Sequence, residues 1–276
     1  MQNLSTVKYE AADFIYRYTN TIGFSDDVPT HTHNGWEFLF IKNGEFSYTV
    51  DGSAFDITPN SLIISRPGAV HTLRPKGIVH YERYAFTAVE SILDKEILER
   101  LPSDLHVLDV QNNDILLSLY EKSGFYLANI EGTTLETILY GIIHELLVNI
   151  YLTAKEPSKP MVSYSNPIVT RAVAFIKDHI QEPLTVQTVS DALFITPSHL
   201  HHCFVKHLHI KPKQYIMLQK LQLVQQALIN AANPTEICHY YGFANYSTFY
   251  RNYQKVFGCC PSDGNQQTLR KIEFKG

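Results

Sequence analysis

Three histidines and one glutamate in the first third of the chain are spaced in a way that suits metal binding. His31, His33 and Glu37 are all odd-numbered on one short segment, so in an extended strand they share a face. The fourth residue, His71, follows Pro67-Gly68 on what reads as a later strand. Three imidazoles and one carboxylate suit Zn²⁺, Ni²⁺, Mn²⁺ or Fe²⁺. The pattern therefore predicts a site at which these four side chains could hold a divalent metal.

The same side chains have a second interpretation, in which no metal is required. They could hydrogen-bond to one another, or they could line a pocket for a small molecule the size of a sugar. Trp36, Tyr48 and Arg66 are further candidates for the lining of that pocket. The predicted ligand-binding residues are His31, His33, Trp36, Glu37, Tyr48 and His71.

A different chemistry is indicated near the C-terminus, between Thr235 and Gly258. This stretch reads as a short helix, a turn at Gly242 and a second, amphipathic helix, because glycine readily takes the left-handed conformation of a tight turn. Phe249, Tyr253 and Val256 recur at helical spacing and should pack inward. The outward side chains at the start of the second helix then stand where a helix-turn-helix contacts base edges. They are Tyr246, Ser247, Tyr250 and Arg251.

A similar pattern occurs upstream. Residues 184–193 read as a helix, and Thr196 and Pro197 are a typical N-cap and first helical residue for the next one, residues 198–208. The segment from Pro212 to Asn230 has almost no helix breakers, and a helix of about 18 residues is roughly 27 Å long. Such a spacer could hold two recognition helices about one turn of DNA, roughly 34 Å, apart.

The region from about Asn166 to Ser262 resembles the tandem helix-turn-helix domain of the AraC family of bacterial transcription regulators. The matching residues of the second unit are Ile237, Gly242, Phe243, Phe249, Arg251, Tyr253, Gly258 and Pro261. Those of the first unit are Ser198, Leu200, Phe204, Pro212, Tyr215, Ile216 and Leu221. The chain departs from the family at His202 and Lys220, where arginine is usual, and at His209, where glycine is usual. A further departure is Gly264-Asn265, where an aromatic residue and arginine are usual.

The resemblance implies contacts to double-stranded DNA from both units. Ser198, His201 and His202 would serve the first recognition helix, and Arg251 suits the O6 and N7 atoms of guanine in the second. Lysines such as Lys206, Lys211, Lys213 and Lys255 would contact phosphates, which adds affinity without sequence preference. The predicted DNA-binding residues are Ser198, His201, His202, Lys206, Tyr246, Ser247, Tyr250, Arg251 and Lys255.

Residues 36–87 read as a series of short strands, which predicts a β-barrel or sandwich. Asn43-Gly44 and Asp51-Gly52 are strong signals for two-residue hairpin turns. The spacing from His31 to Gly44, followed by Pro67-Gly68 and His71, resembles the two motifs of the cupin barrel, whose enzymes hold a divalent metal at the equivalent residues. Two amphipathic helices are expected after the strands, at residues 112–130 and 133–154.

The second of these two helices carries an apolar stripe that could pack on the barrel or pair two subunits. The stripe consists of Leu135, Ile138, Leu139, Ile142, Ile143, Leu146 and Leu147. His144 lies beside it, and we expect it to be a hydrogen-bonded interior or interface residue. The favoured assembly is a homodimer.

Charge is divided unevenly along the chain, which carries a net charge of −4. Residues 1–164 hold 12 basic and 21 acidic side chains, whereas residues 165–276 hold 11 and 6. A basic C-terminal half is attracted to phosphate. The four cysteines, of which Cys259 and Cys260 are adjacent, suit neither a disulfide framework nor a paired zinc motif. No signal peptide or membrane-spanning run is indicated, so we expect a cytoplasmic protein without membrane contact.

The sequence thus predicts an α+β protein of two domains. Residues 1–158 would form a cupin-like domain for ligand sensing and dimerisation, residues 166–264 an all-α double helix-turn-helix, and residues 265–276 a frayed polar tail. We expect a sequence-specific transcription regulator that is controlled by a small-molecule effector and is not an enzyme, with RNA polymerase as a candidate partner. The alternative is a metal-dependent cupin enzyme, such as a dioxygenase or sugar isomerase, with a helical appendage. A third interpretation is a protein-interaction module without affinity for DNA.

Overall fold

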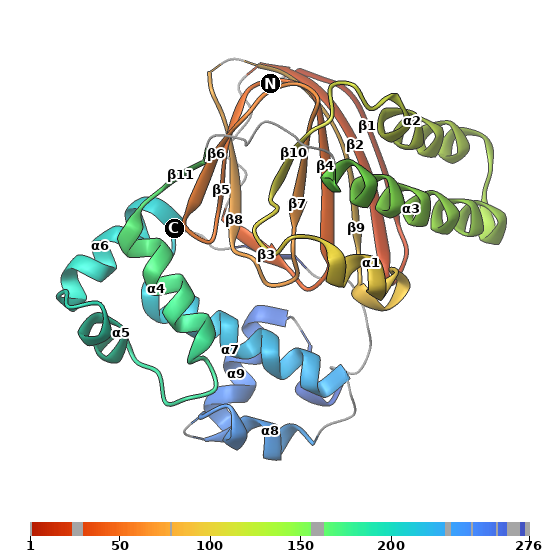
Figure 1. Cartoon of the computed structure of the whole chain (residues 1–276). Helices are drawn as coiled ribbons and strands as arrows, with labels where there is room; N and C mark the ends of the chain where they lie inside the picture. The colour runs from red at the N-terminus through yellow and green to blue at the C-terminus, as the bar shows by residue number, and fades with distance from the viewer. Residues whose placement is uncertain are drawn as a thin grey trace.

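The computed structural model describes residues 2–23, 30–77, 79–155, 163–229, 233–243, 245–257, 259–263 and 271–273. Two antiparallel six-stranded sheets form its β-rich part, to which residues 163–165 and 271–273 each add a short strand, and a group of helices, α4–α9, lies at one end of the sheets (Figure 1). Both the β-rich front domain and the helical C-terminal region agree with the fold class expected from the sequence.

The first sheet has the order β1-β2-β9-β4-β7-β10. Its strands are β1 (Gln2–Glu10), β2 (Phe14–Gly23), β9 (Val79–Ala88), β4 (Trp36–Asn43), β7 (Ser61–Ser65) and β10 (Val107–Asp109). Side chains alternate between its two faces. Phe38, Phe86 and other even-numbered residues pack under the helices, whereas Leu39 and Ala85 face the second sheet.

The second sheet has the order β11-β6-β5-β8-β3-β12. Its strands are β11 (Ser163–Ser165), β6 (Ser53–Ile57), β5 (Phe46–Val50), β8 (His71–Pro75), β3 (His31–His33) and β12 (Lys271–Glu273). Phe46, Tyr48 and Val50 project from β5 into the space between the sheets. This inner face, shared by both sheets, is where the predicted metal-binding residues and Tyr48 lie.

Helices α2 (Asp114–Asn129) and α3 (Gly132–Lys155) cover the outer face of the first sheet (Figure 1). The Tyr120 hydroxyl of α2 donates to the carbonyl of Phe38 over 3.0 Å, and Tyr16 donates to the carbonyl of Tyr120 over 3.1 Å. By length and composition α3 is apolar enough to cross a bilayer. Its buried side, from Leu135 to Ile150, packs instead in the core beneath the helices. The short elements η1 (Glu90–Ile92) and α1 (Lys95–Arg100) precede β10.

The apolar stripe of α3 therefore belongs to the interior of its own domain, which was one of its two interpretations. His144 is exposed, and its Nδ1 atom lies 2.8 Å from the carbonyl oxygen of Tyr140. It is hydrogen-bonded as expected. Of the two expected positions, the interior is wrong because His144 lies on the opposite side of the helix from the stripe, and the interface stays a prediction.

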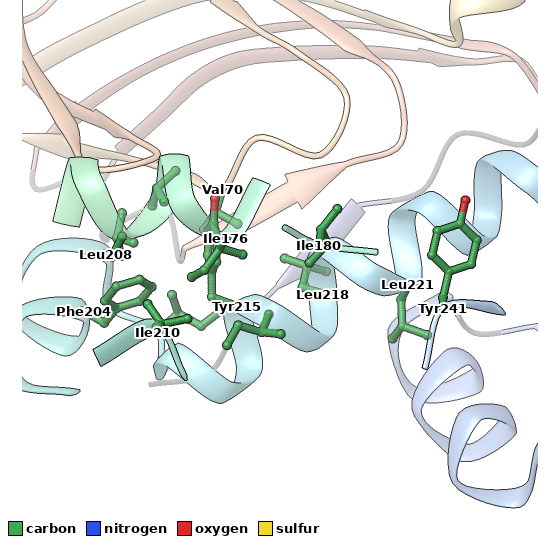
Figure 2. Close-up of a cluster of buried hydrophobic side chains, with 14 of the residues drawn as sticks. Val70, Ile176, Ile180, Phe204, Leu208, Ile210, Tyr215, Leu218, Leu221 and Tyr241 are labelled. Atoms are coloured by element: carbon green, nitrogen blue, oxygen red, sulfur yellow. The ribbon is translucent and has the colours of Figure 1, made fainter. Parts of the chain in front are cut away.

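The C-terminal helices share one hydrophobic core, part of which is drawn in Figure 2. They are α4 (Pro167–Asp178), α5 (Val186–Ala192), α6 (Pro197–Leu208), α7 (Pro212–Ile229), α8 (Pro234–Tyr240) and α9 (Tyr246–Phe257), and the short η2 (Pro261–Asp263) follows. Polar N-caps begin several of them: Asn166 starts α4, Thr185 starts α5, Thr196 starts α6 and Asn233 starts α8.

Three details differ from the sequence-based expectations. Asp51-Gly52 forms the predicted hairpin turn with positive φ at both residues, but Asn43-Gly44 does not, because β4 and β5 belong to different sheets. Ser163–Ser165, which lies between the two domain ranges expected from the sequence, pairs with β6. Part of the tail that was expected to fray, Lys271–Glu273, pairs with β3, while residues 264–270 and 274–276 lie outside the described residues.

Candidate functional sites

The second helix-turn-helix unit consists of α8, a turn and α9. Gly242 occupies the turn with φ of +72°, in the left-handed region where a side chain would be strained. Phe249 and Tyr253 are fully buried and anchor α9 in the helical core. This packing turns the opposite side of α9 outward, where Ser247 and Arg251 are exposed.

Two other predicted DNA contacts of the second unit are less exposed to solvent. Tyr246 is half-buried against the ring of Phe249, with centroids 5.6 Å apart. Tyr250 is also half-buried, and its hydroxyl lies 3.0 Å from the sulfur of Cys260. Lys255 is exposed in the last turn of α9. The expectation that all four side chains at the start of α9 face outward is therefore correct for Ser247 and Arg251 and only partly so for the two tyrosines.

The first unit consists of α5, a turn and α6. Thr196 caps α6 by accepting a hydrogen bond from the His199 backbone over 3.2 Å, as the sequence predicted. Leu200, Phe204 and Leu208 are buried on its inner side. The outer side exposes Ser198, His201, His202 and Lys206. The structure thus presents these predicted contacts together on one exposed helix face.

Helix α7 joins the two units and is their shared support. Lys220 lies at its middle, only 7% exposed, and its ammonium donates to the carbonyls of Glu182 and Tyr241 over 2.9 and 3.2 Å. Glu182 follows α4 on the side of the first unit, whereas Tyr241 ends α8 of the second. Burial lowers the pKa of the Lys220 ammonium. Sequence reasoning noted this lysine only as a departure from the family and missed its bridging position.

In the barrel, the four predicted metal-binding side chains do converge. One ligand atom each from His31, His33, Glu37 and His71 lies within 4.8 Å of the others, and all four residues are buried. Strands β3 and β8 pair at His31, which lies directly opposite His71. Glu37 projects from β4 of the facing sheet, with its carboxylate 3.6 Å from Nε2 of His33 and 3.4 Å from Nε2 of His71.

The electrostatics of this cluster favour an ionised carboxylate. Burial by itself would raise the pKa of Glu37, but the charges and hydrogen bonds of His33 and His71 outweigh it, so the pKa is lowered well below its usual range. Nδ1 of His71 lies 3.0 Å from the carbonyl oxygen of Ala69. When His71 is charged, both ring nitrogens carry a proton, Nδ1 toward Ala69 and Nε2 toward Glu37. Release of the Nε2 proton would leave a lone pair directed at the cluster, with Nδ1 protonated, which is the tautomer that metal-binding histidines use.

The other predicted pocket residues separate into two groups. The Tyr48 hydroxyl lies 2.9 Å from Oγ of Ser65, which donates to Glu37 over 3.4 Å, so Tyr48 belongs to the inner face. Trp36 alternates with Glu37 and lies on the outer face, stacked on Phe38, so its expected position in a barrel pocket is wrong. Arg66 lies 5.3 Å from the Trp36 ring, and its guanidinium donates to the carbonyls of Leu105 and Pro102 over 2.8 and 2.5 Å.

A contact between the barrel and the helices was not foreseen from the sequence. Asp51, in the β5–β6 turn, accepts hydrogen bonds from the Tyr215 hydroxyl of α7 over 3.0 Å and from Lys177 of α4 over 2.6 Å. Val70 of the barrel is buried in the helical core (Figure 2). Nearer the histidine cluster, Gln222 of α7 donates to Thr32 over 3.1 Å.

Comparisons with known proteins agree with this architecture. The family model described as a helix-turn-helix domain matches residues 189–267, and the one described as a cupin domain matches residues 23–80. The XylDLEGF operon transcriptional activator of Pseudomonas putida is 29% identical over 136 residues, which are 48% of this chain and 42% of that protein. The chain thus spans less than half the length of that relative.

Two further similar proteins align over more of the chain. The lactose operon transcription activator of Staphylococcus xylosus is 24% identical over 232 residues, or 81% of each protein. The crystal structure of ToxT from Vibrio cholerae aligns over 94% of this chain and 99% of its own, with 13% identity and a TM-score of 0.37. A cupin domain joined to a helix-turn-helix domain defines the class of this protein. The chain is similar to transcription activators of the AraC type, and its two matched domains are of the kinds that the sequence resemblance implied.

Proposed function

We propose that this chain is a sequence-specific DNA-binding transcription regulator whose activity is controlled by a small-molecule effector in the barrel. The observation that carries the proposal is the pair of exposed recognition helices, α6 and α9, fixed in one core by α7. Ser198, His201 and His202 on α6 and Ser247 and Arg251 on α9 are exposed and suited to bases or phosphates. Two such helices would contact successive major-groove segments of one duplex.

Selection of bound duplexes from a random pool tests this proposal directly. The full chain should enrich a sequence with two recognition segments about one helical turn apart. Affinity for that duplex should exceed affinity for random duplexes by at least about 10³-fold, and both should fall steeply with salt. Enrichment of no sequence, or binding that is insensitive to salt, would contradict a DNA-reading function and favour a protein-interaction module.

A homodimer is the assembly that we propose for the regulator, acting in the cytoplasm. Helices α2 and α3 leave several large apolar side chains exposed, unlike the stripe that packs on the barrel. They are Ile115, Phe125, Val148 and Leu152. Apolar surface of this kind is favoured at subunit interfaces. Sedimentation of the purified chain and of a Phe125→Glu variant should give a dimer and a monomer, respectively; two identical results would exclude this face. RNA polymerase is a proposed partner at the promoter.

The barrel centre is proposed as a divalent metal site, because the cluster fits the ligand set of one. Three imidazoles and an ionised carboxylate are chemically suited to Zn²⁺, Ni²⁺, Mn²⁺ or Fe²⁺. Metal analysis of the purified chain should find near-stoichiometric metal, which the double variant His33→Ala with His71→Ala should lose. A metal-free preparation whose melting temperature does not rise with Zn²⁺ or Ni²⁺ would leave the cluster as a hydrogen-bonded group, since a ligand that binds only the folded state must raise stability.

The alternative of a metal-dependent enzyme is tested by the same material. The AraC-type family consists of regulators rather than enzymes in general, and we propose that this chain is likewise not a catalyst. Metal-free protein should bind the selected duplex with an affinity measurable in the same assay. Turnover of a substrate by the metal-loaded chain, together with failure to bind any duplex, would reverse the assignment.

A further inference from the structure

The barrel contains a second group of polar side chains, distant from the histidine cluster. Arg17 and Thr19 of β2 pair with Ala85 and Arg83 of β9, and Ala85 lies in the core between the sheets. Residues opposite each other in an antiparallel pair project to the same face. Arg17 and Arg83 therefore project from the inner face of the first sheet, and the buried Tyr81 projects beside them.

The group lies well away from the proposed metal site. Arg83 pairs with Ile41 of β4, four residues along that strand from Glu37. At about 3.3 Å per residue, the two positions are about 13 Å apart along the strand. A ligand held here would therefore use side chains different from those of the histidine cluster.

Arg83 and Tyr81 lie close together, and the Arg83 guanidinium keeps a hydrogen-bond donor that no described residue accepts from. The guanidinium carbon of Arg83 lies 5.2 Å from the centroid of the Tyr81 ring. Nε of Arg83 is buried and has no hydrogen-bond partner among the described residues. The Tyr81 hydroxyl is buried beside the Arg83 guanidinium, which is its one hydrogen-bonding neighbour in the described part of the chain. A buried donor without a partner is costly, and in native proteins it commonly marks a place that a ligand, ion or water occupies.

The charge around this group is positive. Among the described residues, no carboxylate forms an ion pair with Arg17 or Arg83. Glu10, on the neighbouring β1, is paired with Lys8 at 2.5 Å. Burial and the negative charge of Glu37 raise the pKa of Tyr81, whereas Arg83 and Arg17 lower it. Two guanidiniums without an ion-pair partner among the described residues suit an anion, because arginine binds the oxygens of carboxylate and phosphate with two parallel hydrogen bonds.

We propose that Arg83, Tyr81 and Arg17 form an anion-binding subsite in the barrel and that the effector carries a carboxylate or phosphate group bound there. Phe46 adds an apolar wall beside this subsite, since its ring centroid is 4.8 Å from that of Tyr81. The effector role rests on the proposed function, whereas anion binding is measurable without DNA. Anion binding and the proposed regulatory function can therefore be refuted independently of each other.

Thermal unfolding of the full chain at constant ionic strength tests the subsite. The probes are inorganic phosphate, acetate and D-gluconate, with D-glucose as the neutral counterpart of gluconate. At least one anion should raise the melting temperature in a saturable manner, and glucose should not, because a ligand specific to the folded state stabilises it. The subsite is overturned if no anion raises the melting temperature, or if glucose raises it as much as gluconate.

Variants connect the effect to the named residues. Arg83→Gln should weaken the apparent anion affinity at least about tenfold, as expected for loss of a charge-assisted hydrogen bond. Tyr81→Phe keeps the packing and should give a smaller loss, so it remains informative if Arg83→Gln does not fold. Arg100→Gln, an exposed arginine paired with Glu96 on α1, is the matched control and should bind as the wild type does. Equal affinity in all the variants would overturn the subsite.

A further measurement separates the subsite from its effector role. The selected duplex is titrated with and without the binding anion. Anion binding without any DNA binding would refute the proposed function and keep the subsite, while DNA binding that no anion alters would remove its effector role.

Discussion

Arg251 is the residue on which sequence readout should depend most. It is exposed on α9, and the nearest hydrogen-bond partner of its guanidinium is the carbonyl of Ser247 at 3.4 Å, a long contact that DNA can displace. Arg251→Ala should weaken binding to the selected duplex by about 1–3 kcal/mol and relax the preference at one base pair. Lys255→Ala, one turn further along, should weaken specific and random duplexes alike. If Arg251→Ala weakened binding to the selected and the random duplexes equally, Arg251 would be a phosphate contact instead.

His106 should make the stability of the barrel sensitive to acid. Burial, reinforced by the charge of Arg66, lowers its pKa from 6.5 to about 4. Between these two values the unfolded chain takes up a proton that the folded chain excludes, so this residue makes stability fall as the pH is lowered from 6.5 to 4. The shift corresponds to about 3 kcal/mol. In urea unfolding across this range, His106→Gln should lose correspondingly less stability; parallel curves for the two proteins would contradict the assignment.

At the scale of the helix, Lys220 of α7 should contribute to the free energy of unfolding, although the sequence marked it only as a departure from the family. Its ammonium satisfies one carbonyl from each helix-turn-helix unit. Lys220→Met fills a similar volume but leaves both carbonyls without this donor, so we expect a loss of about 1–3 kcal/mol in the free energy of unfolding. Lys213→Met, at an exposed position of the same helix, should change it by less than about 0.5 kcal/mol. Similar stabilities of the two variants would mean that water replaces the ammonium.

Elements with strong local signals were predictable from the sequence. The N-cap at Thr196, the turn at Gly242 and the breaker-free run of α7 each depend on neighbouring residues, and each formed as expected. The convergence of His31, His33 and Glu37 with His71 agrees with the cupin motif. The expected reason, one extended strand that carries the first three, is wrong, because Glu37 lies on β4 in the sheet that faces β3. In these cases the information lies within a few residues or within a recognisable spacing.

Other elements depend on long-range pairing, which a local pattern does not encode. β1 and β2 precede the expected strands, and β12 is a three-residue strand that pairs with β3 across the whole chain. Asn43-Gly44 carries a strong hairpin signal, but β4 finds its partners in β7 and β9 instead of β5. Trp36 was misplaced because aromatic type alone does not reveal which face of a strand is outward.

At the scale of the whole molecule, the acidic front domain and the basic helical domain meet through a small number of polar contacts. The Asp51 carboxylate of the barrel accepts hydrogen bonds from Tyr215 and Lys177. In addition, Gln219 of α7 donates to the carbonyl of Gly68 over 3.1 Å. Gly68 itself has φ of +83° and approaches Gln222 so closely that a Cβ atom would lie 2.6 Å from its amide oxygen. The helix that carries both recognition units thus rests on the turn that precedes His71.

Gln222 is the contact that should transmit occupancy of the barrel centre to DNA. Its amide donates to Thr32, which stands between the two β3 histidines of the proposed metal site. A ligand that moves β3 must then either move α7 or break this hydrogen bond. By linkage, Zn²⁺ should change affinity for the selected duplex, and DNA should change affinity for Zn²⁺ by the same factor, typically about 5–150-fold.

Gln222→Ala should reduce this factor toward one while leaving the affinity of the metal-free protein for DNA within about threefold of the wild type. Gln226→Ala is the matched control, because Gln226 is an exposed glutamine one turn along the same helix; it should retain the full factor. Titrations of DNA with and without Zn²⁺, for the wild type and both variants, give the three factors directly. A factor that is the same in all three proteins would place the coupling elsewhere, with the Asp51 contacts and the Gln219–Gly68 hydrogen bond as the next ones to test. A factor of one in the wild type would mean that the barrel centre does not communicate with DNA through metal binding.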